Sequence, residues 1–193
     1  MNNIHTFGDS HSQSGFSEIT GIIVNWQGPK LCYSIGRDGF NLKNIVKNGD
    51  TVIFCFGEID CRCHIHKHIS ESNTYKQIIV NITDKYFIAI KNAIVDYVDL
   101  KVAVYNVVPP VQKINTLENP EYPFLGSDDE RKLYVTYFNE RLRDKCAEYN
   151  FVFFDIYNDC ADINGFLKKT LSDDNVHIKD STYIKQFINN NLL

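Results

Sequence analysis

The sequence predicts an α/β fold, a three-layer α/β/α sandwich built on a five-stranded parallel sheet. Two observations support this class: five short runs of β-branched and aromatic residues, and the segments of helical periodicity that alternate with them. The runs are mostly apolar without alternation, which is typical of strands covered on both faces. Strands that alternate with helices form parallel sheets through right-handed crossovers. With 193 residues, 44% of them hydrophobic, the chain is expected to form one domain, residues 1–193.

The apolar runs give the predicted strands, and in such a sheet the active site lies at their carboxyl ends. A long irregular loop is expected at residues 109–127, which contain four prolines. This loop leaves the carboxyl end of the fourth predicted strand, so it is placed to line or cover the site. The predicted strands are residues 3–8 (NIHTFG), 30–35 (KLCYSI), 51–57 (TVIFCFG), 100–108 (LKVAVYNVV) and 151–156 (FVFFDI).

Periodic apolar residues predict the helices. They recur at three- and four-residue steps over residues 75–97, between the third and fourth strands, and over 134–149, between the fourth and fifth. The acidic cluster at residues 127–130 suits the beginning of the second helix, because carboxylates stabilise a helix N-terminus. A last helix is expected from Ser181 or Thr182 to the end of the chain.

The composition argues against several classes of function. A formal charge of −4 argues against nucleic-acid and anionic-membrane partners. No apolar run is long enough to span a bilayer, and the first residues carry no secretory signal. A cytoplasmic protein is therefore expected, with its six cysteines reduced. The sequence does not predict an oligomeric state.

Two short motifs could carry chemistry together. Gly8-Asp9-Ser10-His11 ends the first predicted strand and presents a serine at its carboxyl end. A serine hydroxyl is a weak nucleophile unless a base takes its proton. Asp174-Asn175-Val176-His177, just before the last helix, supplies a candidate base and a carboxylate that could fold back onto the imidazole. Each motif alone could be an ordinary turn or cap, so the prediction depends on their joint placement.

With these motifs the chain resembles the SGNH (GDSL-type) hydrolase family along its whole length. Gly8-Asp9-Ser10 matches the first block of the family, Asp174-x-x-His177 matches the last, and residues 107–110 (VVPP) are also similar. The resemblance implies a flavodoxin-like fold that needs no metal or organic cofactor. It also implies that Ser10 is the nucleophile, that His177 is the base, and that Asp174 is the carboxylate that orients the imidazole.

The groups that hold the oxyanion match the family less well. Beside the Ser10 amide, the resemblance implies a glycine amide, for which Gly36 is preferred over Gly39. The third block of the family, Gly-x-Asn-Asp, is here Gly57-Glu58-Ile59-Asp60, so isoleucine replaces the donor asparagine. Loss of one such donor costs on the order of 10²–10³ in rate. Arg62 and Asn106 are candidate replacements, although Arg62 could instead pair with Glu58 or Asp60 as a structural bridge.

Four further residues are candidate substrate contacts. Asp9 is expected mainly to order the loop, and His11 either contacts substrate or begins a helix. Asp60 and His64 follow the third strand, at the rim of the expected site. Residues 61–68 (CRCHIHKH) would present alternate ligands on one side if they were extended, as a surface chelate does, but they lack the paired spacing of a zinc finger. No metal is predicted.

The function predicted is that of a serine-dependent acyl ester hydrolase, which forms an acyl-enzyme on Ser10. The substrate expected is a small O-acyl group, such as acetate on a carbohydrate, because the short chain has no lid domain and no large apolar insertion for a lipid tail. Transfer of the acyl group to a sugar is an alternative. A catalytically silent module that binds a glycan or a protein is another, because of Ile59. A Cys/His metal or redox protein is a third, which residues 61–68 alone would suggest.

Overall fold

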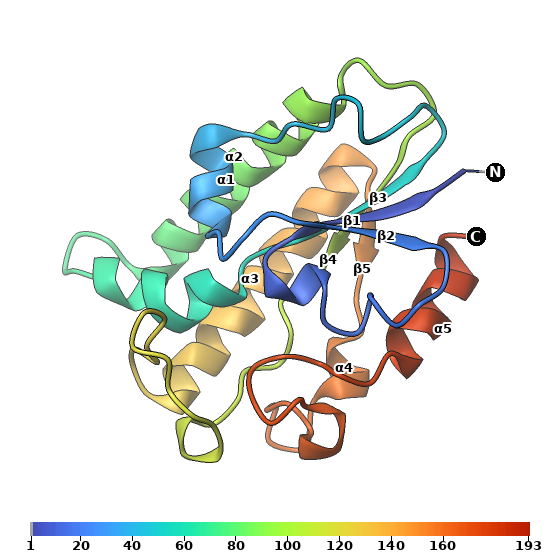
Figure 1. Cartoon of the computed structure of the whole chain (residues 1–193). Coiled ribbons are helices and arrows are strands. Elements are labelled where there is room, and N and C mark those ends of the chain that lie inside the picture. Colours follow the sequence, from blue (N-terminus) through green and yellow to red (C-terminus); the bar gives the residue numbers. More distant parts are fainter. Residues whose placement is uncertain (1) are drawn as a thin grey trace.

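The computed structural model describes residues 2–193, which contain a five-stranded, all-parallel sheet (Figure 1). The strand order is β2-β1-β3-β4-β5, and every neighbouring pair is parallel. This is the order of doubly wound, flavodoxin-like sheets, so the predicted fold class is confirmed. The strands are β1 (Ile4–Gly8), β2 (Ile22–Trp26), β3 (Thr51–Cys55), β4 (Lys101–Tyr105) and β5 (Val152–Phe154).

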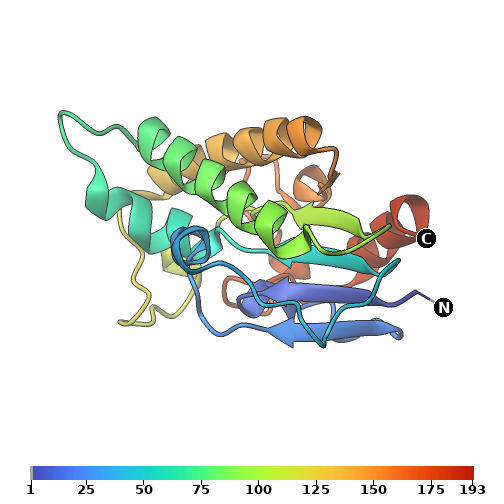
Figure 2. The same cartoon turned by 90° about the horizontal axis from the view of Figure 1, so that it is seen from above.

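Helices cover both faces of the sheet (Figure 2). On one face α1 (Cys32–Asp38), α2 (Tyr75–Ile94) and α3 (Asp128–Tyr149) bury a cluster that includes Phe54 and Val104. On the other face α5 (Thr182–Asn191) and the region around α4 (Tyr157–Cys160) bury a cluster that includes Ile53 and Tyr105. Successive strand residues point to opposite faces, so runs buried on both sides produce the near-continuous apolar pattern of β3 and β4.

Both long helices begin with a capping box. Ser127 accepts a hydrogen bond from the Glu130 amide, and the Glu130 side chain accepts one from the Ser127 amide. Thr74 and Gln77 form the same reciprocal capping box in front of α2. Each box satisfies backbone N–H groups that the first helical turn leaves without partners. The acidic cluster at 127–130 therefore does begin a helix.

The second predicted strand is wrong. Residues 30–35 do not form a strand, since most of them lie in α1, and the second strand of the sheet is β2, at residues 22–26. A six-residue apolar run does not distinguish a strand from a short buried helix, and here the buried Cys32 and Ile35 are spaced by one helical turn. The true strand lies at the edge of the sheet and is only half-buried, so its sequence lacks the signature of a covered strand.

The long loop at residues 109–127 is confirmed, with one short 3₁₀ turn at Lys113–Asn115. It crosses the carboxyl edge of the sheet, because the Leu125 amide donates to the Arg62 carbonyl and Thr116 Oγ1 contacts Asn175 Oδ1 at 3.1 Å. All six cysteines are buried and form no disulfide, as expected. Within residues 2–193, none of the helices combines the length and apolarity needed to cross a bilayer.

Candidate active site

Ser10 is presented by a tight turn at the end of β1. A Cβ at Gly8 would lie 2.2 Å from the Cys55 carbonyl oxygen, so only glycine lets β1 and β3 approach this closely. After the strand, residues Ser10–Ser12 form one 3₁₀ turn, η1, which Asp9 caps by accepting a hydrogen bond from the His11 amide at 2.8 Å. Ser10 therefore opens this turn at the carboxyl edge of the sheet, and it is half-buried.

Ser10 and His177 are in contact, although 167 residues separate them. The Ser10 Oγ lies 2.8 Å from His177 Nε2, and His177 Nδ1 lies 2.7 Å from Asp173 Oδ2. Because a carboxylate only accepts hydrogen bonds, Nδ1 carries the proton and Nε2 is left as an acceptor. This tautomer can take the hydroxyl proton from Ser10.

The carboxylate beside His177 belongs to Asp173, so the prediction that Asp174 orients the imidazole is wrong. Asp173 also accepts hydrogen bonds from the amides of Asn175 and His177, which close the turn around it. Burial acts to raise the pKa of Asp173, but the hydrogen bond and charge of His177, together with the two backbone hydrogen bonds, hold the pKa below its ordinary value. Asp174 adopts a left-handed conformation, with φ 66°, and lines a separate hollow with Gln112 and Lys169.

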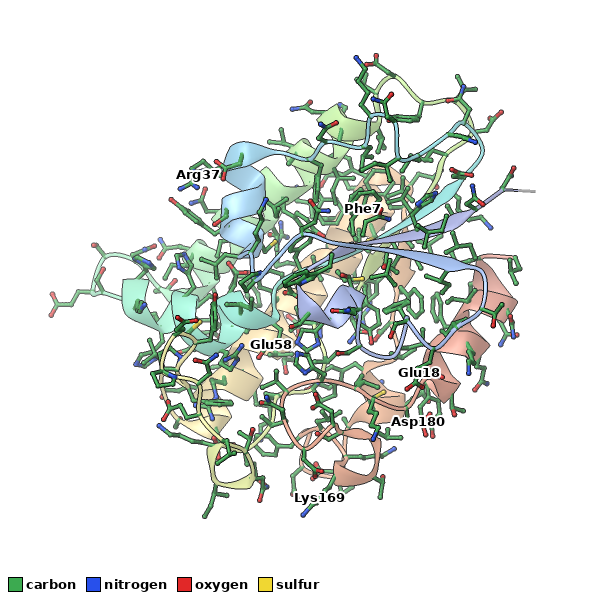
Figure 3. The ribbon with its side chains drawn as sticks, viewed as in Figure 1. Phe7, Glu18, Arg37, Glu58, Lys169 and Asp180 are labelled. Atoms are coloured by element: carbon green, nitrogen blue, oxygen red, sulfur yellow. The ribbon has the colours of Figure 1, made fainter. Side chains whose placement is uncertain are left out.

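The contacts continue from His177 to His11, and from His11 to Glu58. The rings of His11 and His177 are 4.8 Å apart, and His11 Nε2 is 3.6 Å from Glu58 Oε2. Burial lowers the pKa of His11, which favours the neutral ring. Glu58 lies under the end of β1 at the carboxyl edge (Figure 3). Burial acts to raise the pKa of Glu58, but the Arg62 guanidinium and His11 together lower it to about 2.

Arg62 is held by Glu58 and by the Tyr122 carbonyl, so it is not positioned as an oxyanion donor. Its Nε and Nη2 donate to the two carboxylate oxygens of Glu58 at 2.7 and 3.0 Å, and Nη1 donates to the Tyr122 carbonyl. The guanidinium also lies over the Phe124 ring. Arg62 thus forms the structural bridge to Glu58 that the sequence left open as an alternative, and it ties the 109–127 loop to the segment after β3.

Two further predicted oxyanion groups are also misplaced. Asn106 is buried, and its side chain donates to the Val107 carbonyl and accepts from the Ile156 amide, linking the ends of β4 and β5. Gly36 lies inside α1, where a Cβ would approach the Lys85 Cβ to 2.8 Å, so this glycine serves the close packing of α1 on α2. Figure 3 shows Arg37, the next residue, on the outer surface well away from Glu58.

Asp9 and Asp60 are fully buried, so neither carboxyl group is placed to contact a substrate. Asp9 orders the turn, as expected. Asp60 accepts hydrogen bonds from the amides of Cys32 and Tyr33 at 2.6 and 3.1 Å, and so caps the first turn of α1. Burial raises the pKa of Asp60 to about 7.

The Cys/His segment is helical, so its ligands do not alternate along an extended strand. Residues Asp60–His64 form a π-helical turn, η2, and Ile65–His68 a 3₁₀ turn, η3. Within the described residues, no three His, Cys, Asp or Glu side chains are grouped to hold a metal ion. His64 is half-buried between the rings of Tyr33 and His68, at 4.9 and 4.4 Å. It lines a cavity described below.

Sequence reasoning missed two members of this arrangement, Asp173 and Glu58. Asp173 precedes His177 by four residues instead of the three of the Asp-x-x-His motif. Only the geometry of the turn shows that its carboxylate, and not that of Asp174, contacts the imidazole. Glu58 was named only as a possible partner of Arg62. Its spacing of four residues from Arg62 is the signal for a helical ion pair, and the sequence offered no helix to place the pair on.

Comparisons with known proteins identify the fold. No family model and no curated protein matches the chain. A solved structure from Streptococcus pneumonia, provisionally named a platelet activating factor, is 16% identical with a TM-score of 0.70, over 100% of this chain and 84% of its own. A GDSL-like lipase from Bacteroides thetaiotaomicron is 14% identical with a TM-score of 0.62, over 98% and 88%. An acetyl xylan esterase is 14% identical with a TM-score of 0.61, over 99% and 100%. Likeness at these identities shows a shared fold.

Proposed function

We propose that this chain, whose α/β/α fold is that of the SGNH hydrolases, is a serine-dependent ester hydrolase. The observation that carries the proposal is the line of contacts from Ser10 Oγ to His177 Nε2 and from His177 Nδ1 to Asp173. A nucleophile, its base and the carboxylate that fixes the base stand in hydrogen-bonding order at the carboxyl edge of the sheet.

The reaction proceeds through an acyl-enzyme. Ser10 Oγ attacks the ester carbonyl while His177 Nε2 takes the hydroxyl proton, and Asp173 stabilises the imidazolium. The tetrahedral intermediate collapses, and the alcohol leaves with that proton while the acyl group stays on Ser10. Water then attacks the acyl-enzyme as His177 takes its proton, and the acid is released as Ser10 recovers its own.

The oxyanion is held by backbone amides. The Ser10 amide opens η1 and has no partner within that turn. We assign the second amide to Gly28 in place of Gly36, because Gly28 lies two residues after β2, whose Trp26 pairs with Gly8 of β1. A Cβ on Gly28 would meet no atom within 4 Å, so there is open space beside this residue. Without an asparagine at position 59, turnover should be lower by on the order of 10²–10³ than with a third donor.

The substrate proposed is a small O-acyl ester, such as acetate on a carbohydrate. The longest irregular segment at this edge, residues 109–127, is tied to Arg62 and is no separate lid domain. One of the structural neighbours is an acetyl xylan esterase. Transfer of the acyl group to a sugar hydroxyl would use the same acyl-enzyme. The buried Ile59 favours a second candidate function, a silent module that binds a glycan or a protein.

Fluorophosphonate labelling followed by intact-mass analysis tests the proposal. The wild type should gain one adduct, Ser10→Ala none, and His177→Ala the same adduct much more slowly. Ser12→Ala is the matched control, since Ser12 lies in the same turn with its hydroxyl donated to the Asp9 carbonyl, and it should label like the wild type. Absence of an adduct on folded wild type would reject the hydrolase and favour the binding module.

A further inference from the structure

A cavity of about 300 Å³ lies on the same edge of the molecule as Ser10 and has no part in the proposed chemistry. It is open to solvent on one side and is lined by α1, by η2 and η3, and by the first turns of α2, which lie together in both views (Figures 1 and 2). The volume is at the lower end of the range for small-molecule sites. Two isoleucines of α2, Ile78 and Ile82, form part of its lining. The polar and aromatic part is formed by Tyr33, His64, His68, Asn73, Gln77 and Asn81.

The walls suit a neutral polyhydroxylated ligand. None of the lining residues is a carboxylate, a lysine or an arginine, so nothing there pairs with a phosphate, a carboxylate or an ammonium group. Three carboxamides lie among them, and a carboxamide both donates and accepts, as a sugar hydroxyl does. Gln77 Oε1 already accepts from Thr74, which leaves its NH₂ group for a ligand. Asn73 Nδ2 already donates to the His68 carbonyl, which leaves its Oδ1.

Aromatic rings supply the complementary apolar face. His64 lies between Tyr33 and His68 in a short stack of rings, and such faces pack on the C–H groups of a pyranose. Burial, together with the neighbouring His68 and Lys67, lowers the pKa of His64 to about 4. At neutral pH its imidazole is therefore uncharged and offers one donor and one acceptor.

One helical segment connects the cavity to the proposed active site. It begins near Glu58, which lies beside His11, and reaches His64 in the cavity wall six residues later. Because a π-helical turn rises less per residue than the 1.5 Å of an α-helix, the two residues are at most about 9 Å apart along the axis of this segment. We propose that the cavity is a subsite for a neutral sugar unit, adjacent in a glycan to the unit whose ester is held at Ser10. This inference rests on the proposed function, because it takes the glycan to be the alcohol part of the substrate.

Direct binding tests the subsite without turnover. Ser10→Ala protein is titrated with xylotriose and cellotriose as neutral probes, and with glycerol 3-phosphate as a charged one, by calorimetry or by chemical-shift changes. Saturable binding of a neutral trisaccharide is expected in the millimolar range. Adding Asn81→Ala, or separately His64→Ala, should weaken it by about fivefold or more, the effect of losing one neutral hydrogen-bonded group.

Asn92→Ala is the matched control, because Asn92 lies on the same helix α2 but lines a different hollow, beside Arg37. It should leave binding unchanged. The subsite is overturned if neither trisaccharide binds, if Asn81→Ala and Asn92→Ala have equal effects, or if glycerol 3-phosphate binds more tightly. Sugar binding without labelling of Ser10 would reject only the hydrolase, whereas labelling without sugar binding would reject only the subsite.

Discussion

At the scale of single residues, two adjacent aspartates illustrate how placement decides a role. Asp173 accepts three hydrogen bonds, including one from His177 Nδ1, whereas Asp174 turns away into a hollow on the other side of its turn. In the sequence, both aspartates lie within four residues of His177. Of the two, only Asp173 contacts the ring, so only Asp173 can fix the tautomer that the proposed reaction requires.

Asp173→Asn should therefore lower kcat for an aryl acetate by about 10²–10⁴, because the amide permits the wrong tautomer of His177. Asp174→Asn should change kcat by less than about twofold, as an exposed substitution away from the chemistry does. Steady-state kinetics on both variants, with circular dichroism to verify folding, provide the measurement. A larger loss in Asp174→Asn than in Asp173→Asn would contradict the assignment.

His11 supports His177 from behind, so its ring should matter for turnover as well. His11→Ala removes the buried surface on which the His177 ring packs, and kcat/KM should fall by about tenfold as the imidazole gains freedom. His11→Phe keeps a ring there and should recover part of the loss. If the alanine and phenylalanine variants are equally slow, packing is not the role of His11.

At the scale of elements, α1 depends on a side chain outside itself. It has only seven residues, and its N-cap residue, Leu31, makes no capping hydrogen bond. So short a helix is not stable alone in water. Asp60 supplies the missing cap from the neighbouring segment, by accepting hydrogen bonds from Cys32 and Tyr33. The packing of Gly36 against α2 completes its support.

This cap should make stability depend on pH. Because the pKa of Asp60 is about 7 in the folded protein and about 4 in an unfolded chain, the folded state binds the extra proton between these values. The free energy of unfolding contributed by Asp60 is therefore greatest below pH 4 and falls as the pH rises to 7. Relative to Asp60→Asn, the wild type should lose on the order of a few kcal/mol across this window. Urea unfolding of the wild type and of Asp60→Asn at pH 4.5 and 7.5 measures the difference in their unfolding free energies. A difference that does not change with pH would contradict the prediction.

The sequence predicted four of the five strands and the long helices well, and the β2 edge of the sheet poorly. β1, β3, β4 and β5 and the long helices lie where apolar runs, periodicity and capping residues place them. The second strand was predicted at the position of the short α1 instead of at the half-buried β2, because a six-residue apolar run is compatible with a strand or with a short buried helix. For the same reason Gly36 was predicted to follow a strand and to donate its amide to the oxyanion, whereas it lies inside α1. Arg62 was misassigned because it pairs with Glu58 in a helix the sequence did not show and with Tyr122, 60 residues away. Asn106 was misassigned because its side chain accepts from the Ile156 amide, 50 residues away.

At the scale of the whole molecule, the strand order explains where the site lies. The chain turns in opposite directions from β1 to β2 and from β3 to β4, so β1 and β3 form the switch point of the sheet. Ser10 follows β1, while Glu58 and Arg62 follow β3. Their meeting at one edge was predictable from the α/β class. The contact of His177 with Ser10 was predictable only through the resemblance of the two motifs to a known family.

The Glu58–Arg62 pair should stabilise the whole carboxyl edge, because both side chains are about one-tenth exposed and the pair holds the 109–127 loop. Arg62→Met leaves the buried Glu58 charge without its partner and should cost about 3–5 kcal/mol of unfolding free energy. The double variant Glu58→Gln with Arg62→Met removes both charges and should be more stable than Arg62→Met alone. Urea denaturation of the three proteins decides, and a cost below about 1 kcal/mol for Arg62→Met would show the pair to be unimportant.

The distance along the chain between Ser10 and His177 bears on how the protein is made. Translation at about 5–20 residues per second brings the histidine out of the ribosome roughly 10–30 seconds after the serine, since 167 residues separate them. Throughout that interval the nascent chain carries a serine without a base, whose hydroxyl is a weak nucleophile. The proposed activity therefore starts only once translation has passed position 177 and the C-terminal region has folded back onto the sheet. The nascent chain thus lacks the proposed esterase activity until its fold is complete.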